Sequence, residues 1–162
     1  MKALIVYNSQ KGTTKKYAEK IGRYIETFDG NAIVKSISET TPQDIKSCDL
    51  LLLGTWTNGR FLFGQKPDKA WIDFANKLPR LEGKETVLFT TYNILTGSMF
   101  RNMKKQLEPK GYKILSCMKS RDGKMDYYSF VALKFALNYH THSGIRVIQR
   151  TEEEVLEAVP AF

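Results

Sequence analysis

Cysteine and histidine are scarce in this sequence. Its 162 residues include only Cys48, Cys117, His140 and His142. Each cysteine lies beside a predicted strand and the two lack the spacing of a metal site, so we interpret both as buried reduced thiols rather than parts of a disulfide framework. The histidines have no neighbouring cluster of cysteines or carboxylates, which favours surface or loop histidines over a metal pair or a proton relay.

Several motifs of catalysis and nucleotide binding are also missing. The sequence has no Gly-x-Ser-x-Gly, no His-Glu-x-x-His, no Gly-x-Gly-x-x-Gly and no glycine-rich loop that ends in Gly-Lys-Ser/Thr. Hydrolase, metalloprotease, dinucleotide-binding and nucleoside-triphosphatase functions therefore have no support. The sequence assigns no catalytic residue and no metal ligand.

Long apolar runs are absent as well. One lysine precedes the apolar run Ala3–Tyr7, which ends at Asn8 and does not resemble a signal peptide. We therefore expect a cytoplasmic protein without a transmembrane segment. Because 42% of the 162 residues are apolar, the chain can fill one core, and we expect a single domain, 1–162.

Basic residues, in contrast, are in excess. The formal net charge is +8, and between residues 101 and 124 eight basic residues stand against Glu108 and Asp122. The basic residues of this stretch are Arg101, Lys104, Lys105, Lys110, Lys113, Lys119, Arg121 and Lys124. A field of this sign attracts an acidic protein, an anionic small molecule, a membrane surface or nucleic acid, and a solvated face without a partner is the simplest alternative.

Strand and helix patterns alternate along the chain. Five segments predict strands: Lys2–Asn8, Asn31–Ile37, Asp49–Gly54, Glu85–Thr91 and Tyr112–Lys119. Helical spacing predicts helices over Thr14–Phe28, from Pro67 onward and over Met99–Leu107, while Thr40–Ser47 predicts a turn of helix or a loop. This alternation predicts an α/β fold with a doubly wound, five-stranded parallel sheet.

The chain is less regular after the fifth predicted strand. Phe130–Leu137 predicts an extra helical segment, and His140–Gly144 interrupts its pattern. Thr151 and Glu154 then form a capping box that opens a closing helix.

The connection between the first predicted strand and the first helix is the most informative segment. Ser9, Thr13 and Thr14 supply hydroxyl donors, and Gly12 lets a ligand approach the backbone. The first N–H groups of the helix have no partner within it, so the segment can hold a phosphate. The alternative is an ordinary connection in which Thr13 or Thr14 caps the helix.

The order of residue types from Ile5 to Ala18 resembles the N-terminal signature of the flavodoxin family. That signature consists of two aliphatic residues, an aromatic, Ser or Thr, a small residue, Thr, and Ala within the helix. The resemblance implies a flavodoxin-like fold with strand order 2-1-3-4-5, and flavin mononucleotide (FMN) with its phosphate at this loop. The net charge departs from the family, because flavodoxins that act as soluble electron carriers are typically acidic.

The resemblance also implies that the loops after the third and fourth strands contact the flavin. Trp56 would stack on the isoalloxazine ring, with inward packing as the alternative. Tyr92 would either stack on the flavin or anchor its loop, since the Gly-Asp-containing loop of the soluble carriers is missing here. The expected cofactor-binding residues are Ser9, Gln10, Lys11, Gly12, Thr13, Thr14, Thr55, Trp56, Thr57, Asn58, Gly59, Thr91, Tyr92 and Asn93.

Three functions remain open. The first is electron transfer between a reductase and an acceptor, in which the basic stretch docks an acidic redox partner protein. The second is a flavin-dependent oxidoreductase, since the segment around Tyr127 and Tyr128 loosely resembles the quinone-linked protoporphyrinogen oxidases. It would act on a quinone or an anionic small molecule and touch a membrane peripherally. The third is a basic, non-redox binding module, although no nucleic acid is expected without a recognition-helix signature.

Overall fold

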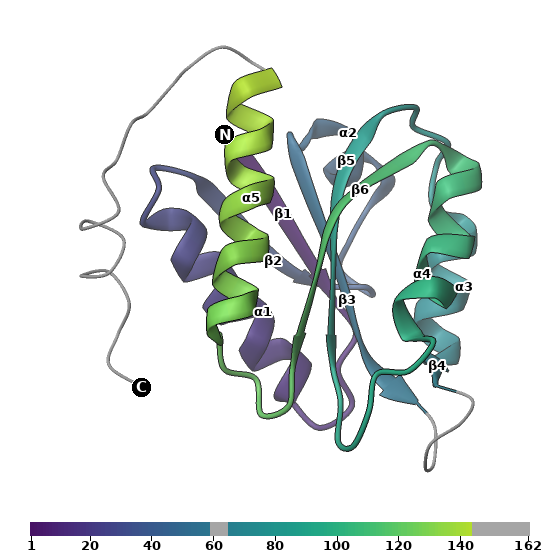
Figure 1. Cartoon of the computed structure of the whole chain (residues 1–162). Helices are drawn as coiled ribbons and strands as arrows, with labels where there is room; N and C mark the ends of the chain where they lie inside the picture. Colours follow the sequence, from purple (N-terminus) through teal and green to yellow (C-terminus); the bar gives the residue numbers. More distant parts are fainter. Residues whose placement is uncertain (59–64, 144–162) are drawn as a thin grey trace.

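The computed structural model describes residues 1–58 and 65–143, in which strands and helices alternate (Figure 1). The strands are β1 (Lys2–Tyr7), β2 (Asn31–Ser36), β3 (Leu50–Asn58), β4 (Lys66–Pro67), β5 (Lys84–Thr91) and β6 (Tyr112–Ser120). The α-helices are α1 (Thr13–Glu26), α2 (Pro42–Ser47), α3 (Lys69–Lys77), α4 (Met99–Leu107) and α5 (Tyr127–Ser143), and a 3-10 turn, η1 (Glu108–Lys110), follows α4.

Five strands form a parallel sheet in the order β2-β1-β3-β5-β6. The short β4 lies off this path and pairs antiparallel with β3. Once β4 is set aside, this is the predicted 2-1-3-4-5 order, which is thereby confirmed. In such a sheet the loops that follow β1, β3 and β5 meet at the carboxyl edge, where ligands bind in doubly wound folds.

Helices cover both faces of the sheet (Figure 1). On one face, α1 and α5 pack on residues such as Ile5, Leu52 and Phe89. On the other face, α2, α3 and α4 pack on the residues that alternate with these, such as Leu4 and Leu53. Successive side chains of a strand point to opposite faces, so a central strand covered on both sides is apolar throughout, as the continuous leucine run of β3 shows.

The end of β3 differs from the prediction. The strand was expected to stop at Gly54, but it continues to Asn58 because Thr55 and Trp56 pair with the end of β5 and the β-branched and aromatic side chains suit a strand. Pro67 does not open α3 but lies in β4, a two-residue strand in which a missing N–H is tolerated. Asp68 caps α3 instead, accepting a hydrogen bond of 3.0 Å from the N–H of Ala70.

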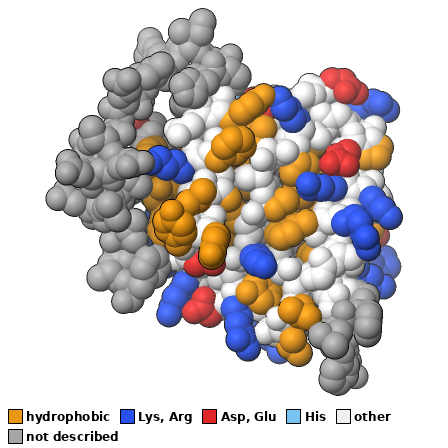
Figure 2. Space-filling model, viewed as in Figure 1, with side chains coloured by type: hydrophobic (Ala, Val, Ile, Leu, Met, Phe, Trp, Pro, Cys, Tyr) orange, Lys and Arg blue, Asp and Glu red, His pale blue; other side chains and the backbone are white. Residues whose placement is uncertain are grey.

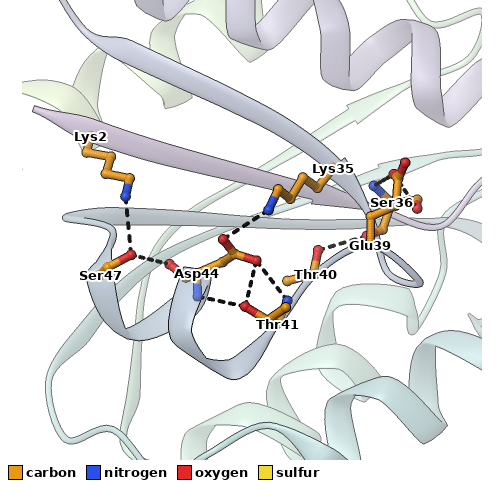
Figure 3. A network of polar contacts seen from close by, with 8 residues as sticks. All are labelled: Lys2, Lys35, Ser36, Glu39, Thr40, Thr41, Asp44 and Ser47. Carbon is orange, nitrogen blue, oxygen red and sulfur yellow. Dashed lines mark hydrogen bonds and ion pairs between the residues drawn. The ribbon is translucent and has the colours of Figure 1, made fainter.

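The segment predicted as a turn of helix or a loop forms the short helix α2, stabilised by a polar network (Figure 3). Thr41 and Asp44 form a capping box, in which each side chain bonds the other residue's backbone N–H. Asp44 also pairs with Lys35 of β2 at 3.0 Å, and Lys2 of β1 donates to Ser47. The network therefore ties α2 to the two strands beside it.

The interruption predicted at His140–Gly144 is wrong for its first four residues, because α5 continues to Ser143. His140 is not a free surface histidine, since its Nδ1 lies 2.7 Å from Glu85 Oε2 on β5 and this contact holds the helix against the sheet. The predicted closing helix lies outside the described residues. Within the described part of the chain, no helix is both long enough and apolar enough to cross a membrane.

Candidate functional site

A cleft opens at the carboxyl edge of the sheet, where the end of β3 meets the loops after β1, β5 and β6. Its lining residues are Ser9, Gln10, Lys11, Thr13, Thr14, Trp56, Thr57, Thr91, Tyr92, Asn93 and Arg121. All but the last belong to the set expected from the sequence. The topology alone brings them together, because Ser9 and Tyr92 are far apart in the chain but follow strands whose ends share one edge of the sheet.

At one end of the cleft, the loop after β1 turns directly into α1. Gly12 occupies the N-cap position with φ +83°, and no side chain caps the helix. The alternative in which Thr13 or Thr14 caps α1 is therefore wrong. A Cβ atom at Gly12 would have no heavy atom within 4 Å, so the space beside this backbone is open for a ligand.

The hydroxyls of Thr14 and Ser9 do not cap α1, and both are buried. Thr14 is buried, and its Oγ1 lies 2.7 Å from Oγ1 of Thr91 at the end of β5. Ser9 Oγ is buried and has no hydrogen-bond partner in the part of the chain that the structure describes. Because an unpaired buried hydroxyl costs free energy, this atom needs a partner, and a phosphate oxygen at the start of α1 would supply one. The loop therefore fits the phosphate of FMN.

At the other end, aromatic side chains line the cleft. Trp56 is half-buried there, unlike Trp71, which is fully buried in the core, so the cleft position agrees better with a ring-stacking role than with inward packing. Tyr92 also lines the cleft, and its backbone N–H donates to the carbonyl of Ser120 at 3.1 Å. Both expectations for Tyr92 are thus compatible: its backbone anchors the loop and its ring faces the cleft.

Two expected residues that the structure describes, Thr55 and Gly12, are not among those that line the cleft. Thr55 is fully buried in the sheet, where its carbonyl accepts a 2.8 Å hydrogen bond from Thr90. Gly12 contributes backbone alone. Gly59 and the side chain of Asn58 lie outside the described part of the structure.

Arg121 is the cleft residue that the sequence analysis did not assign. It follows β6, and Thr91 pairs with Ser120, so Arg121 emerges next to Tyr92. Gly123 packs the same loop against α1, because a Cβ there would lie 2.8 Å from the carbonyl oxygen of Thr13. The basic stretch 101–124 contained the only sequence signal for Arg121, and the sheet order was needed to bring it to the cleft.

The thiols and the buried tyrosine hydroxyl of the described chain are not set up to act as nucleophiles or metal ligands. Burial raises the pKa of both thiols, Cys48 and Cys117, which favours the neutral form. Cys48 is buried as expected, whereas Cys117 is only half-buried. Burial also raises the pKa of Tyr17, whose hydroxyl donates to Ser129 at 2.6 Å and links α1 to α5. Among the described residues, no cluster of His, Cys, Asp and Glu could hold a metal ion.

Comparison with known proteins agrees with this geometry. The flavodoxin family model matches residues 5–133. No curated protein sequence matches the chain. Among solved structures, Megasphaera elsdenii flavodoxin in its two-electron reduced form has a TM-score of 0.71 at 21% identity, over 87% of this chain and 99% of that one. Flavodoxin 1 from Bacillus cereus has a TM-score of 0.66 at 19% identity, over 88% and 99%.

A larger protein contains the same fold. The rubredoxin oxygen:oxidoreductase of Desulfovibrio gigas has a TM-score of 0.67 at 13% identity, and the match covers 87% of this chain but 35% of that one. At such identities the likeness shows the fold alone, and the family assignment rests on the family model. Because that model spans most of the sequence, the chain belongs to the flavodoxin family, and its cofactor is FMN.

Proposed function

We propose that the protein is an electron carrier, which holds FMN in the cleft and exchanges electrons between a reductase and a partner protein with an acidic surface. The observation that carries the proposal is the buried hydroxyl of Ser9, which has no partner among the described residues and lies in a cleft between the end of β3 and the loops after β1 and β5. Bound flavin supplies the redox chemistry, since its ring accepts and releases electrons.

The protein would bind the cofactor from two sides. The hydroxyls of Ser9 and Thr13 and the free N–H groups of α1 would hold the phosphate. Trp56 and Tyr92 would bound the ring and limit the access of water. Stacking of each ring on the flavin would contribute about 0.5–1.5 kcal/mol to the binding free energy, in addition to the burial of apolar area.

The chemistry of the lining residues favours a carrier over an enzyme that processes a substrate. Among the described residues that line the cleft there is no carboxylate, histidine or cysteine, so none of these groups is placed to transfer protons to a substrate. The charged residues among the described lining are Lys11 and Arg121, and both are basic. A basic rim of this kind suits an acidic partner.

The proposal is tested by titrating the purified full-length protein with FMN and with riboflavin, using the quenching of flavin fluorescence as the readout. Because riboflavin lacks the phosphate, we expect it to bind at least about tenfold more weakly, a difference of roughly 1.4 kcal/mol. Equal affinity for the two flavins would contradict phosphate binding by the loop after β1. A protein that binds neither flavin would contradict the proposed function as a whole.

The carrier role is tested separately by reducing the FMN-loaded protein with light and mixing it with electron acceptors under anaerobic conditions. We expect rapid electron transfer to protein acceptors and no saturable turnover of quinones or porphyrinogens. Saturable turnover of one of these small molecules would instead support the oxidoreductase alternative.

A further inference from the structure

The large hydrophobic side chains that are most exposed lie in two segments of the described chain, the loop after β5 and the helix α5. They are Ile94, Leu95, Tyr127, Tyr128, Val131 and Phe135. Tyr127 and Tyr128 are 73% and 80% exposed, and Figure 2 shows hydrophobic side chains gathered on the face that carries α5 and β6. Exposed apolar groups that cluster in this way mark interaction sites.

A groove runs through this face. It lies between α4 and α5 over β6, has a volume of about 410 Å³, and is lined by residues that include Phe100, Cys117, Lys119 and Tyr128. We call it the edge groove. In the described part of the chain β6 pairs with β5 alone, so the groove follows an open edge of the sheet. Phe135 lies seven residues after Tyr128 and therefore on the same side of α5, which extends the apolar wall.

The charge around the edge groove is positive. Lys119 lines it, and Lys104 is close enough to Cys117 to act on that thiol electrostatically. Two carboxylates also lie nearby, because Asp126 lines the groove and Glu108 acts on Cys117 as Lys104 does, but between residues 101 and 124 basic residues outnumber acidic ones by eight to two. Asp126 accepts a 2.8 Å hydrogen bond from the N–H of Ser129, and Asp122 pairs with Lys124 at 3.4 Å.

We propose that the edge groove is the docking surface for an acidic redox protein, which inserts an apolar side chain between α4 and α5 while its carboxylates face Lys104 and Lys119. This proposal rests on the proposed carrier function and identifies where the partner binds. The groove adjoins the flavin cleft, because the Lys119 ammonium lies 5.9 Å from the ring centre of Tyr92, and Tyr92 lines that cleft. A partner seated here is therefore one side-chain layer away from the cofactor.

Other occupants fit the surface less well. A second copy of the chain would bring two proteins of net charge +8 together, and like charges across an interface are unfavourable. An anionic bilayer would meet the lysines, but a concave groove favours a protruding side chain over a lipid surface. Lysines at a sheet edge also prevent unwanted strand pairing, yet that role does not require the exposed aromatic side chains beside them.

The test uses the FMN-loaded full-length protein and, as a probe, an acidic plant-type [2Fe–2S] ferredoxin. Its affinity is measured by fluorescence anisotropy of the labelled ferredoxin, and the rate at which it reduces the flavin is measured by stopped flow. The variant Lys104→Glu/Lys119→Glu reverses two charges at the edge groove, and Tyr128→Ser/Phe135→Ser removes its apolar wall. The control Lys20→Glu/Lys46→Glu makes the same charge change at exposed positions elsewhere.

We expect the Lys104→Glu/Lys119→Glu variant to lower the association rate roughly tenfold and to flatten its salt dependence, while the control pair retains most of the rate. We expect the apolar variant to weaken binding mainly through faster dissociation. Equal losses in the control and groove variants would overturn the proposal.

Two further readouts separate the alternatives. Binding of the protein to phosphatidylserine vesicles with the same dependence on these variants, without ferredoxin binding, would overturn the proposal in favour of a membrane. A concentration-dependent dimer in sedimentation would favour a second copy. If the proposed function fails, the protein stays colourless in the FMN titration. If only the docking proposal fails, the protein is yellow and its rate of reaction with ferredoxin is the same in the wild type and in the groove variants.

Discussion

Thr14 Oγ1 and Thr91 Oγ1 lie 2.7 Å apart in the protein interior and join the start of α1 to the end of β5. One hydroxyl donates to the other, so each satisfies its neighbour across 77 residues of sequence. The contact fixes the loop after β1 against the strand that leads to Tyr92. It thereby joins two of the segments that line the cleft.

We expect the single substitutions Thr14→Val and Thr91→Val each to lower the free energy of unfolding by about 1–3 kcal/mol, because each leaves a buried hydroxyl without its partner. The double variant should cost clearly less than the sum, since no hydroxyl is left unpaired. Urea unfolding of the four proteins measures the coupling. Strict additivity of the two losses would show that the hydroxyls do not interact.

Gly12 supports a second prediction through its positive φ and the open space beside it. Gly12→Ala should destabilise the fold by about 1 kcal/mol through backbone strain and should also weaken FMN binding, because the methyl group enters the space of the phosphate. Gly83→Ala is the matched control, since Gly83 has φ +75° and an equally open environment far from the cleft. If both variants lose stability alike and both keep their affinity for FMN, the loop does not approach the phosphate.

Trp56 gives an optical test of the cleft. The protein has two tryptophans, and Trp71 is fully buried in the core while Trp56 lines the cleft. FMN should quench most of the emission of Trp56, and Trp56→Phe should abolish most of this quenching while it weakens FMN binding by roughly 1 kcal/mol. Undiminished quenching in Trp56→Phe would place the ring elsewhere.

The sequence predicted the architecture well because its signals are local. Each strand is a short apolar run, and the leucine run of β3 is buried on both faces in the structure, as the prediction required. The connection from β1 to α1 follows from the same logic, since a strand, a hydroxyl-rich turn and a helix are contiguous in the chain. Such features need no knowledge of distant contacts.

The errors arose where distant contacts decide local structure. β3 extends beyond Gly54 because β5 offers hydrogen-bond partners to Thr55 and Trp56. α5 continues through His140 because Glu85 of β5 lies beside it. Arg121 reaches the cleft only through the sheet order. Each of these depends on which strands become neighbours, and a pattern of side chains along one segment does not contain that information.

Asp44 provides a prediction on pH. The N–H of Thr41, together with Lys35 and the Thr41 hydroxyl, lowers the pKa of Asp44 from 3.8 to about 2. Because the folded-state pKa lies below the unfolded one, the stabilisation is present above about pH 4 and is lost as the pH falls toward 2. We expect the stability difference between the wild type and Asp44→Asn to shrink over this window, measured by denaturant unfolding at several pH values. A difference that stays constant would contradict this assignment.

Arg121 leads to the last prediction, on the redox potential. Reduced flavin carries more negative charge than oxidised flavin, so a cation at the cleft stabilises the reduced form and makes the potential less negative. At a separation of about 8 Å in a water-like medium, one charge contributes about 0.5 kcal/mol, which corresponds to roughly 20 mV for one electron.

Arg121→Gln should therefore shift the potential of the bound flavin by about that amount in the negative direction. The shift should decrease as ionic strength rises, because the side chain is exposed and salt screens it. Lys46→Gln removes the same charge from α2 and should leave the potential almost unchanged. A spectroscopic redox titration of the three proteins at low and high salt measures these shifts. Equal shifts in both variants would mean that the overall charge of the protein, rather than Arg121, sets the potential.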